Sequence, residues 1–117
     1  MKPLRTRLFL KLPNGELHTS DLEVDLPTLY EGPGRPAGAK NAPLYQSVAR
    51  FPGVLPATGF SNRSYSTLEA MLGVLASAKA FCKEFEKSGG RIYGAMADDE
   101  SVPDLEEPIK LKDFFSL

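Results

Sequence analysis

"STLEAMLGVLASAKAFCKEFEKSGG", residues 66–90, carries the longest regular pattern in the chain. Ser66 and Glu69 have the spacing of a capping box, in which a serine and a glutamate close the first turn of a helix. Apolar residues then recur every three or four positions. Gly89 and Gly90 can end the helix, because glycine takes the left-handed C-terminal conformation without a Cβ clash. The pattern predicts a long α-helix over residues 66–87.

The apolar stripe of this helix predicts its buried face. In the expected core, Leu68, Met71, Leu72, Leu75, Cys82 and Phe85 pack against Leu8, Leu10, Val24 and Ile92.

The opposite face of the predicted helix carries small residues where a solvent-facing helix usually shows long polar ones. Alanine as a strong helix former accounts for part of this. A mid-helix glycine such as Gly73 costs about 1 kcal/mol relative to alanine, however, which favours a covered face. The cover is then a loop, another protein, or a second copy of the chain. For a homodimer, the candidate face consists of Ala70, Gly73, Ser77 and Ala80.

Alternating apolar residues predict the strands. Residues 5–12 and 16–26 alternate on either side of Asn14 and Gly15, a pair that suits a two-residue hairpin turn. A two-residue turn would place the apolar residues of the two strands on opposite faces of the sheet, so we expect a bulge near residues 19–21. Residues 44–51 read as a third strand and residues 91–97 as a strand after the helix. Residues 109–115 read as a last short strand or extended tail.

Together these elements predict one α+β domain spanning residues 1–117. We expect a mainly antiparallel sheet of four to five strands packed on one long α-helix, in the order β-β-β-α-β-(β).

Charge is divided along the chain, although the net charge is only −1. A Pro/Gly-rich segment at about residues 27–64 is basic, because residues 32–68 contain four cations and no acid. Residues 89–117 contain seven acids against three cations, and we expect residues 98–108 to form an acidic loop. Such a division affects the choice of partner more than the net charge does.

The stretch "EGPGRPAGAK", residues 31–40, resembles a phosphate-binding loop only in its glycine content. Pro33 and Pro36 remove amide donors, and no helix follows closely enough to present its N-terminus. A surface loop is the simpler reading, and a loop that binds a partner is the functional one. The candidate partner-binding residues are Arg35, Lys40, Arg50, Arg63 and Tyr45.

Chemistry in a conventional active site has little support in the sequence. One histidine, His18, and one cysteine, Cys82, cannot assemble a zinc site within a monomer, so we expect no metal and no cofactor. Residues 98–107 lack the ligand spacing of an EF-hand loop. Acid–base catalysis by a carboxylate pair stays open, because burial rather than sequence sets the pKa values.

Location and function follow from these observations. No apolar run approaches the roughly 20 residues that span a bilayer, and residues 1–16 lack the apolar region of a secretory signal. A single cysteine fits a reducing compartment, so we expect a cytoplasmic protein without a membrane partner. The leading hypothesis is a small non-enzymatic interaction protein that binds, or inhibits, another macromolecule, with another protein as the first expected partner. The alternative is binding of RNA or single-stranded DNA through residues 30–65, and an enzyme comes third.

Overall fold

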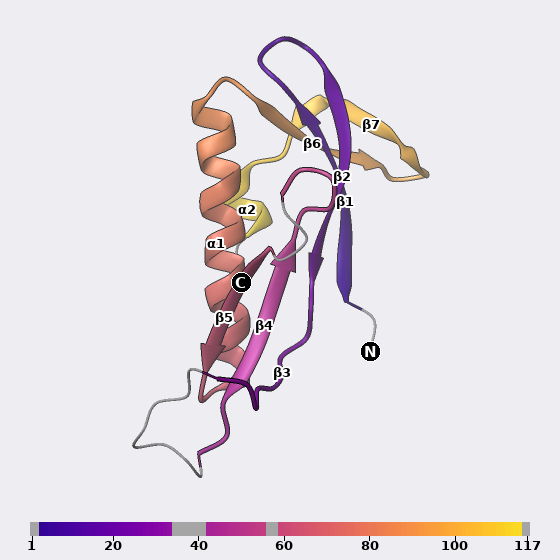
Figure 1. The fold of residues 1–117 in the computed structure, drawn as a ribbon. Helices are drawn as coiled ribbons and strands as arrows, with labels where there is room; N and C mark the ends of the chain where they lie inside the picture. Colours follow the sequence, from indigo (N-terminus) through magenta and orange to yellow (C-terminus); the bar gives the residue numbers. More distant parts are fainter. Residues whose placement is uncertain (1–2, 34–41, 56–58, 116–117) are drawn as a thin grey trace.

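The computed structural model describes residues 3–33, 42–55 and 59–115 of the 117-residue chain. Over these ranges the chain folds into an antiparallel sheet of seven strands with a long helix against it (Figure 1). The predicted α+β class and single long helix are confirmed, with more strands than the four or five expected. The elements are β1 (Leu4–Lys11), β2 (Leu17–Val24), β3 (Thr28–Leu29), β4 (Tyr45–Arg50), β5 (Phe60–Ser64), α1 (Thr67–Lys87), β6 (Arg91–Met96), β7 (Asp99–Pro108) and α2 (Leu111–Phe114).

Strand β1 lies in the middle of the sheet, between β2 and β6. Beyond β6 lies β7, and beyond β2 lies β4. Gln46 of β4 pairs with both Thr28 of β3 and Arg63 of β5, so β3 and β5 use opposite edges of β4. Strand β5 is therefore one margin of the sheet and β7 the other.

The hairpin of β1 and β2 is regular, and the bulge predicted at residues 19–21 is absent from its uninterrupted register. The loop is one residue longer than the predicted turn. Leu12 N–H donates to Glu16 O, and Gly15 N–H donates to Leu12 O. Gly15 takes φ +91°, a conformation that glycine adopts at little cost. This geometry is that of a three-residue hairpin loop.

The extra loop residue resolves the conflict between the two apolar phases. It shifts the register by one, so that Leu8 pairs with Ser20 and Thr6 with Leu22. All of the even-numbered residues then share one face of the hairpin, and Leu8, Leu10, Leu22 and Val24 are buried together.

Helix α1 begins and ends where the sequence predicts. Ser66 is the N-cap, and its hydroxyl oxygen accepts a hydrogen bond from Glu69 N–H at 3.3 Å. At the other end, Gly89 takes φ +100° and its N–H donates to Glu86 O. Both ends therefore follow from local sequence.

The buried face of α1 differs from the predicted one. The residues that point into the sheet are spaced by four: Ala70, Val74, Ala78 and Cys82. Leu68 and Leu72, which we expected in the core, are 63% and 38% exposed. Met71, Leu75 and Phe85 are only partly buried. The helix is thus rotated so that its small residues, not its large ones, meet the sheet most closely.

Close approach of β5 explains this rotation. Asn62 of β5 donates through Nδ2 to the main-chain oxygens of Glu69 and Ala70, at 3.1 and 3.3 Å. A Cβ added at Gly73 would lie 1.9 Å from that same nitrogen. Only small side chains fit at this contact, so the chain's own sheet covers the part of the small-residue face around Ala70 and Gly73.

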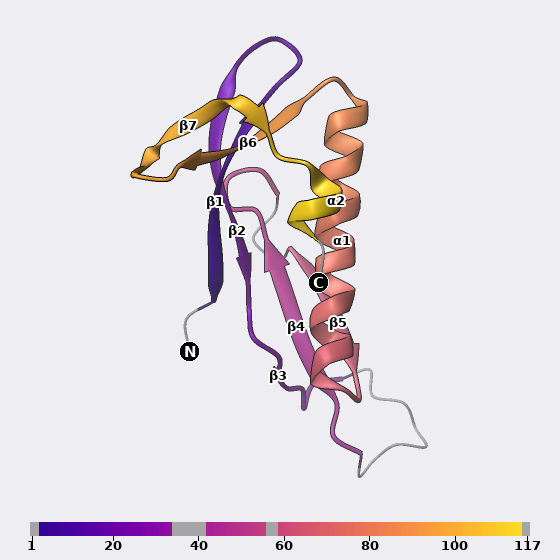
Figure 2. The same ribbon diagram turned by 180° about the vertical axis from the view of Figure 1, so that it is seen from behind.

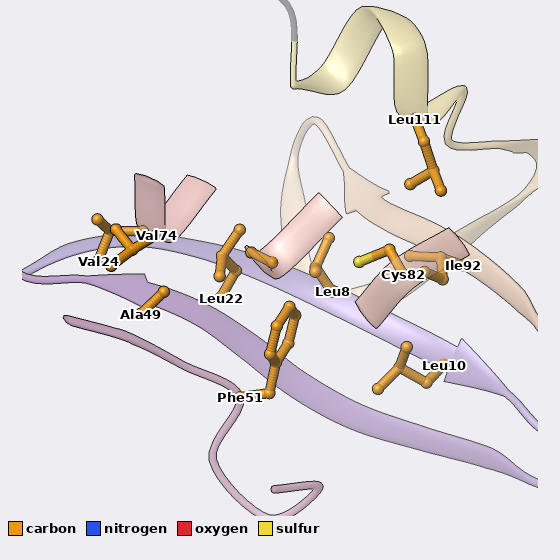
Figure 3. Close-up of a cluster of buried hydrophobic side chains, with 11 residues drawn as sticks. Leu8, Leu10, Leu22, Val24, Ala49, Phe51, Val74, Cys82, Ile92 and Leu111 are labelled. Carbon is orange, nitrogen blue, oxygen red and sulfur yellow. The ribbon is translucent and has the colours of Figure 1, made fainter. Parts of the chain in front are cut away.

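One core holds the helix, the sheet and the C-terminal helix together (Figure 3). Phe51 and the leucines of β1 and β2 point toward α1, while Leu111 reaches the core from α2. Its buried members are Leu8, Leu10, Leu22, Val24, Ala49, Phe51, Val74, Ala78, Cys82, Ile92 and Leu111.

The C-terminal region departs most from expectation. The predicted acidic loop at residues 98–108 is strand β7, and the predicted last strand or tail contains the short helix α2. Strand β7 pairs with β6 through two shifts of register. It carries Pro103 and Pro108, which are tolerated because they lie in a strand at the margin of the sheet.

The molecule is elongated, with principal extents of 51 × 30 × 25 Å. The hairpin of β6 and β7 projects from the side of the sheet, and α2 lies beside α1 (Figure 2). Among the described residues, neither helix combines the length and the apolar character needed to cross a membrane.

Candidate interaction surface

The main functional candidate is an apolar stripe on α1 that the fold covers only in part, with Leu68 and Leu72 exposed and Met71 and Leu75 half-buried. We call Leu68, Met71, Leu72 and Leu75 the exposed stripe. They follow a spacing of three, one and three, which puts them on one side of a helix. Exposed apolar side chains that gather in this way mark binding surfaces more often than leucines scattered singly.

The exposed stripe continues into a groove of about 230 Å³ between the sheet and the two helices. Thr6 is the one polar residue of its lining. Phe114 of α2 and Phe115, its C-cap, form one wall, their rings edge to face with centroids 4.9 Å apart. The lining is Leu4, Thr6, Leu22, Val24, Met71, Leu75, Phe114 and Phe115. We call it the α1–α2 groove.

The strand at the mouth of this groove has an open edge. Strand β6 pairs with β1 only from Leu8 to Lys11. The first half of β1, from Leu4 to Arg7, pairs with β2 on one side and has no partner strand on the other among the described residues. Leu4 and Thr6 line the groove from this half-strand. An apolar groove and an unpaired strand edge therefore adjoin.

Of the five predicted partner-binding residues, the structure describes Arg50, Arg63 and Tyr45. Arg50 lies on β4 and forms a two-pronged ion pair with Asp25, with both nitrogen–oxygen distances 2.8 Å. The hydrogen bonds from Arg50 lower the pKa of Asp25, and the same pair raises the pKa of Arg50. Arg50 is thereby engaged within the fold.

Arg63 is engaged as well. Its guanidinium carbon lies 3.8 Å from the centroid of the Tyr30 ring, and its Nε donates to Gln46 Oε1 at 2.8 Å. Tyr45 is half-buried in β4. Arg35 and Lys40 fall outside the described residues, so the structure places neither of them.

The predicted dimer face is corrected by the contact with β5. Ala70 has an exposed fraction of 0%, and Gly73 packs on Asn62. Ser77 is partly buried and donates its hydroxyl to Gly73 O at 3.3 Å. Ala80 alone of the four is exposed. Ala70 and Gly73 therefore belong to an internal contact, which removes them from the predicted face, and self-association of the chain stays a prediction.

Two titratable groups of the described residues, Asp25 and Cys82, have shifted pKa values that do not suit acid–base or nucleophilic work. The lowered pKa keeps Asp25 ionised, which is the opposite of what a proton donor needs. Burial raises the pKa of Cys82 to about 12, so its thiol stays protonated. Within the described ranges, no three His, Cys, Asp or Glu side chains gather as metal ligands would.

Sequence reasoning found the residues of the exposed stripe but assigned them to the core. The width of the apolar surface around the helix could have shown that some of these residues lie in the core and others on the surface. Helix α1 has apolar or small residues around most of its circumference, and a helix facing one sheet can bury only part of that.

Comparison with known proteins adds no assignment. No protein-family model matches the chain, and no curated protein or solved structure is significantly similar to it.

Proposed function

We propose that this chain is a small interaction protein that binds another protein through the exposed stripe and the α1–α2 groove. The observation that carries the proposal is the exposure of Leu68 and Leu72 beside a groove lined by other apolar side chains. Covering one such leucine stabilises a complex by roughly 1.5–3 kcal/mol. Inhibition is the special case in which the covered surface of the partner is its own active site.

The chemistry of the surface favours a protein over a nucleic acid. Nucleic-acid sites rely on cations that are free to meet phosphates. Arg50 and Arg63, the two described cations of the basic segment, are engaged by Asp25 and by Tyr30 with Gln46. The leucine, valine and phenylalanine side chains that line the groove carry no charge and no hydrogen-bond donor for a phosphate.

The test compares two double variants with the parent as baits in lysate from the cells that carry this chain. Leu68→Glu with Leu72→Glu places two carboxylates on the exposed stripe. Leu17→Glu with Leu105→Glu places two carboxylates on leucines that are also exposed but lie elsewhere. All three baits are expected to unfold within about 0.5 kcal/mol of one another, because each site is on the surface.

The stripe variant should retain at least tenfold less of the specific partner than the parent, and the control should retain as much as the parent. Equal retention by the two double variants would contradict the proposal. Lysate treated with nuclease gives a second comparison. Loss of the partner on that treatment would favour the nucleic-acid alternative instead.

A further inference from the structure

The pairing of β1 with β2 fixes which residues in the first half of β1 point their main-chain N–H and C=O groups away from β2. Leu12 N–H donates to Glu16 O across the hairpin, and antiparallel strands alternate between hydrogen-bonded and non-hydrogen-bonded pairs. Even-numbered residues of β1 therefore bond to β2. The N–H and C=O of Arg5 point the other way, to the side where the pairing of β6 has already ended at Leu8.

The two faces of this half-strand differ in character. Leu4 and Thr6 face the α1–α2 groove. Arg5 and Arg7 face the opposite side of the sheet, where they share Asp21 at 3.6 and 2.6 Å. Arg5 also lies 3.9 Å from Glu100, yet its side chain is still 52% exposed. Glu23 lies opposite Arg5 on that same face. The edge thus has an apolar side, and a second side where two arginines lie among acids.

We propose that the occupant of this site is an extended segment of the partner protein, added as a strand to the open edge of β1. The inference rests on the proposed function and names the form of its partner. In an added strand, alternate side chains point to opposite faces. Those on the groove side would be apolar and meet Phe115 and Leu75. Those on the other side would be acidic and meet Arg5 and Arg7.

A second copy of the chain fits this edge poorly. Antiparallel pairing of two β1 edges through their outward main-chain groups sets Arg5 against Arg5 or Arg7 of the other copy. Like charges directly opposite each other destabilise a strand pair. The Arg5 side chain keeps half of its surface in water, so a carboxylate of a foreign strand can still reach it, whereas a second copy brings another arginine to the same place.

The peptide test uses a fluorescein-labelled decapeptide that alternates valine and glutamate, and a control decapeptide of five valines followed by five glutamates. Composition and charge are identical, and only the alternation differs. Fluorescence anisotropy should show the parent binding the alternating peptide at least tenfold more tightly than the block peptide. Equal affinities, or no binding of the alternating peptide at millimolar protein, would overturn the strand-addition proposal.

A pair of variants isolates the main-chain donor. Arg5→Pro removes the outward N–H, which β2 does not use, and proline is tolerated at strand edges. Arg5→Ala removes the same charge and keeps the N–H. The proline variant should bind the alternating peptide at least tenfold more weakly than the alanine variant. Matching affinities of the two variants would show that no strand is added there.

Hydrogen exchange supplies a readout on the unaltered protein. The amide of Arg5 should exchange at least tenfold more slowly when the alternating peptide saturates the parent, and an unchanged rate would count against the proposal. Light scattering of the free parent tests whether a second copy occupies the edge instead. A dimer that Arg5→Pro dissociates would assign the edge to a second copy and overturn the proposal.

The two proposals can fail separately. The stripe variant can lose its lysate partner while the alternating peptide shows no preferential binding. That result would support the proposed interaction function and contradict strand addition.

Discussion

Gly73 and Asn62 form the tightest contact between α1 and the sheet. The side chain of Asn62 supplies two hydrogen bonds to main-chain oxygens of the helix, and the absence of a Cβ at Gly73 makes room for it. Glycine lowers the stability of a helix, but at this position it allows Asn62 to form those two hydrogen bonds. The pair explains why the small-residue face of α1 is internal at Ala70 and Gly73.

This contact predicts a reversal of sign in a double-mutant cycle. Gly73→Ala in the parent displaces Asn62, and the loss of two hydrogen bonds at about 1 kcal/mol each outweighs the gain in helix propensity of about 1 kcal/mol. Gly73→Ala should therefore destabilise the parent by about 1 kcal/mol. In an Asn62→Ala background it should stabilise the protein by about the same amount. Urea unfolding of the four proteins measures both, and equal effects in the two backgrounds would refute the account.

The ion pair of Asp25 and Arg50 predicts a dependence on pH. Because the folded-state pKa of Asp25 lies below its unfolded value, its stabilisation is complete above the unfolded pKa and is lost as pH falls through the folded one. The side chains are about one-third exposed, so we expect no more than about 1 kcal/mol. The difference in unfolding free energy between the parent and Asp25→Asn should shrink between pH 5 and pH 3. A constant difference over that range would mean that the pair contributes nothing.

Cys82 predicts a reporter of global unfolding. The thiol is 1% exposed and its pKa is raised to about 12, so both access and ionisation oppose its modification. At pH 8 an aromatic disulfide reagent should modify the native protein only through unfolding. The rate should then rise with urea in parallel with the unfolding constant. Rapid labelling without urea would place the thiol near the surface.

At the scale of elements, helix α1 shows what periodicity can and cannot establish. Its existence, its cap at Ser66 and its end at Gly89 follow from local sequence, and all three are observed. Its rotation depends on Asn62, a polar residue in a strand that the sequence does not reveal. Strand β5, with the sequence FSNRS, lacks an alternating apolar pattern because it lies at the margin of the sheet.

The rotated face predicts unequal effects of two truncations on α1. Val74→Ala should lower the unfolding free energy by about 2 kcal/mol, because it leaves a cavity in the core. Leu68→Ala should change it by less than about 0.5 kcal/mol, because the side chain is largely in water. Thermal or urea unfolding distinguishes the two. A larger loss at Leu68 would restore the face expected from sequence.

Other elements escaped prediction for related physical reasons. Strand β7 contains Pro103, Pro108 and several acids, which read as a loop, and it is a strand only because β6 supplies a partner. The register of the β1–β2 hairpin depended on one additional residue in the loop that contains Gly15. The open edge at Arg5 depends on where the pairing of β6 stops. Each of these is a property of pairing between segments, which local patterns do not encode.

At the scale of the whole molecule, several of the described arginines are paired with acids within the fold. Arginines of β1 meet Asp21 and Glu100, and Arg50 meets Asp25. We therefore expect a 20-nucleotide single strand to show no saturable binding at 0.15 M salt and 100 micromolar protein. Fluorescence anisotropy measures this. Tight binding that weakens steeply with salt would favour the nucleic-acid alternative.

The central place of β1 has a consequence for how the chain folds. Leu10 pairs with Ile92, so the middle of the sheet joins segments that ribosomes make far apart in time. Synthesis proceeds at about 5–20 residues per second, and contacts of such long sequence separation form slowly. The nascent β1–β2 hairpin must wait for several seconds with its leucines uncovered, until β6 emerges. A chaperone that holds short apolar strands would find its target in residues 4–24.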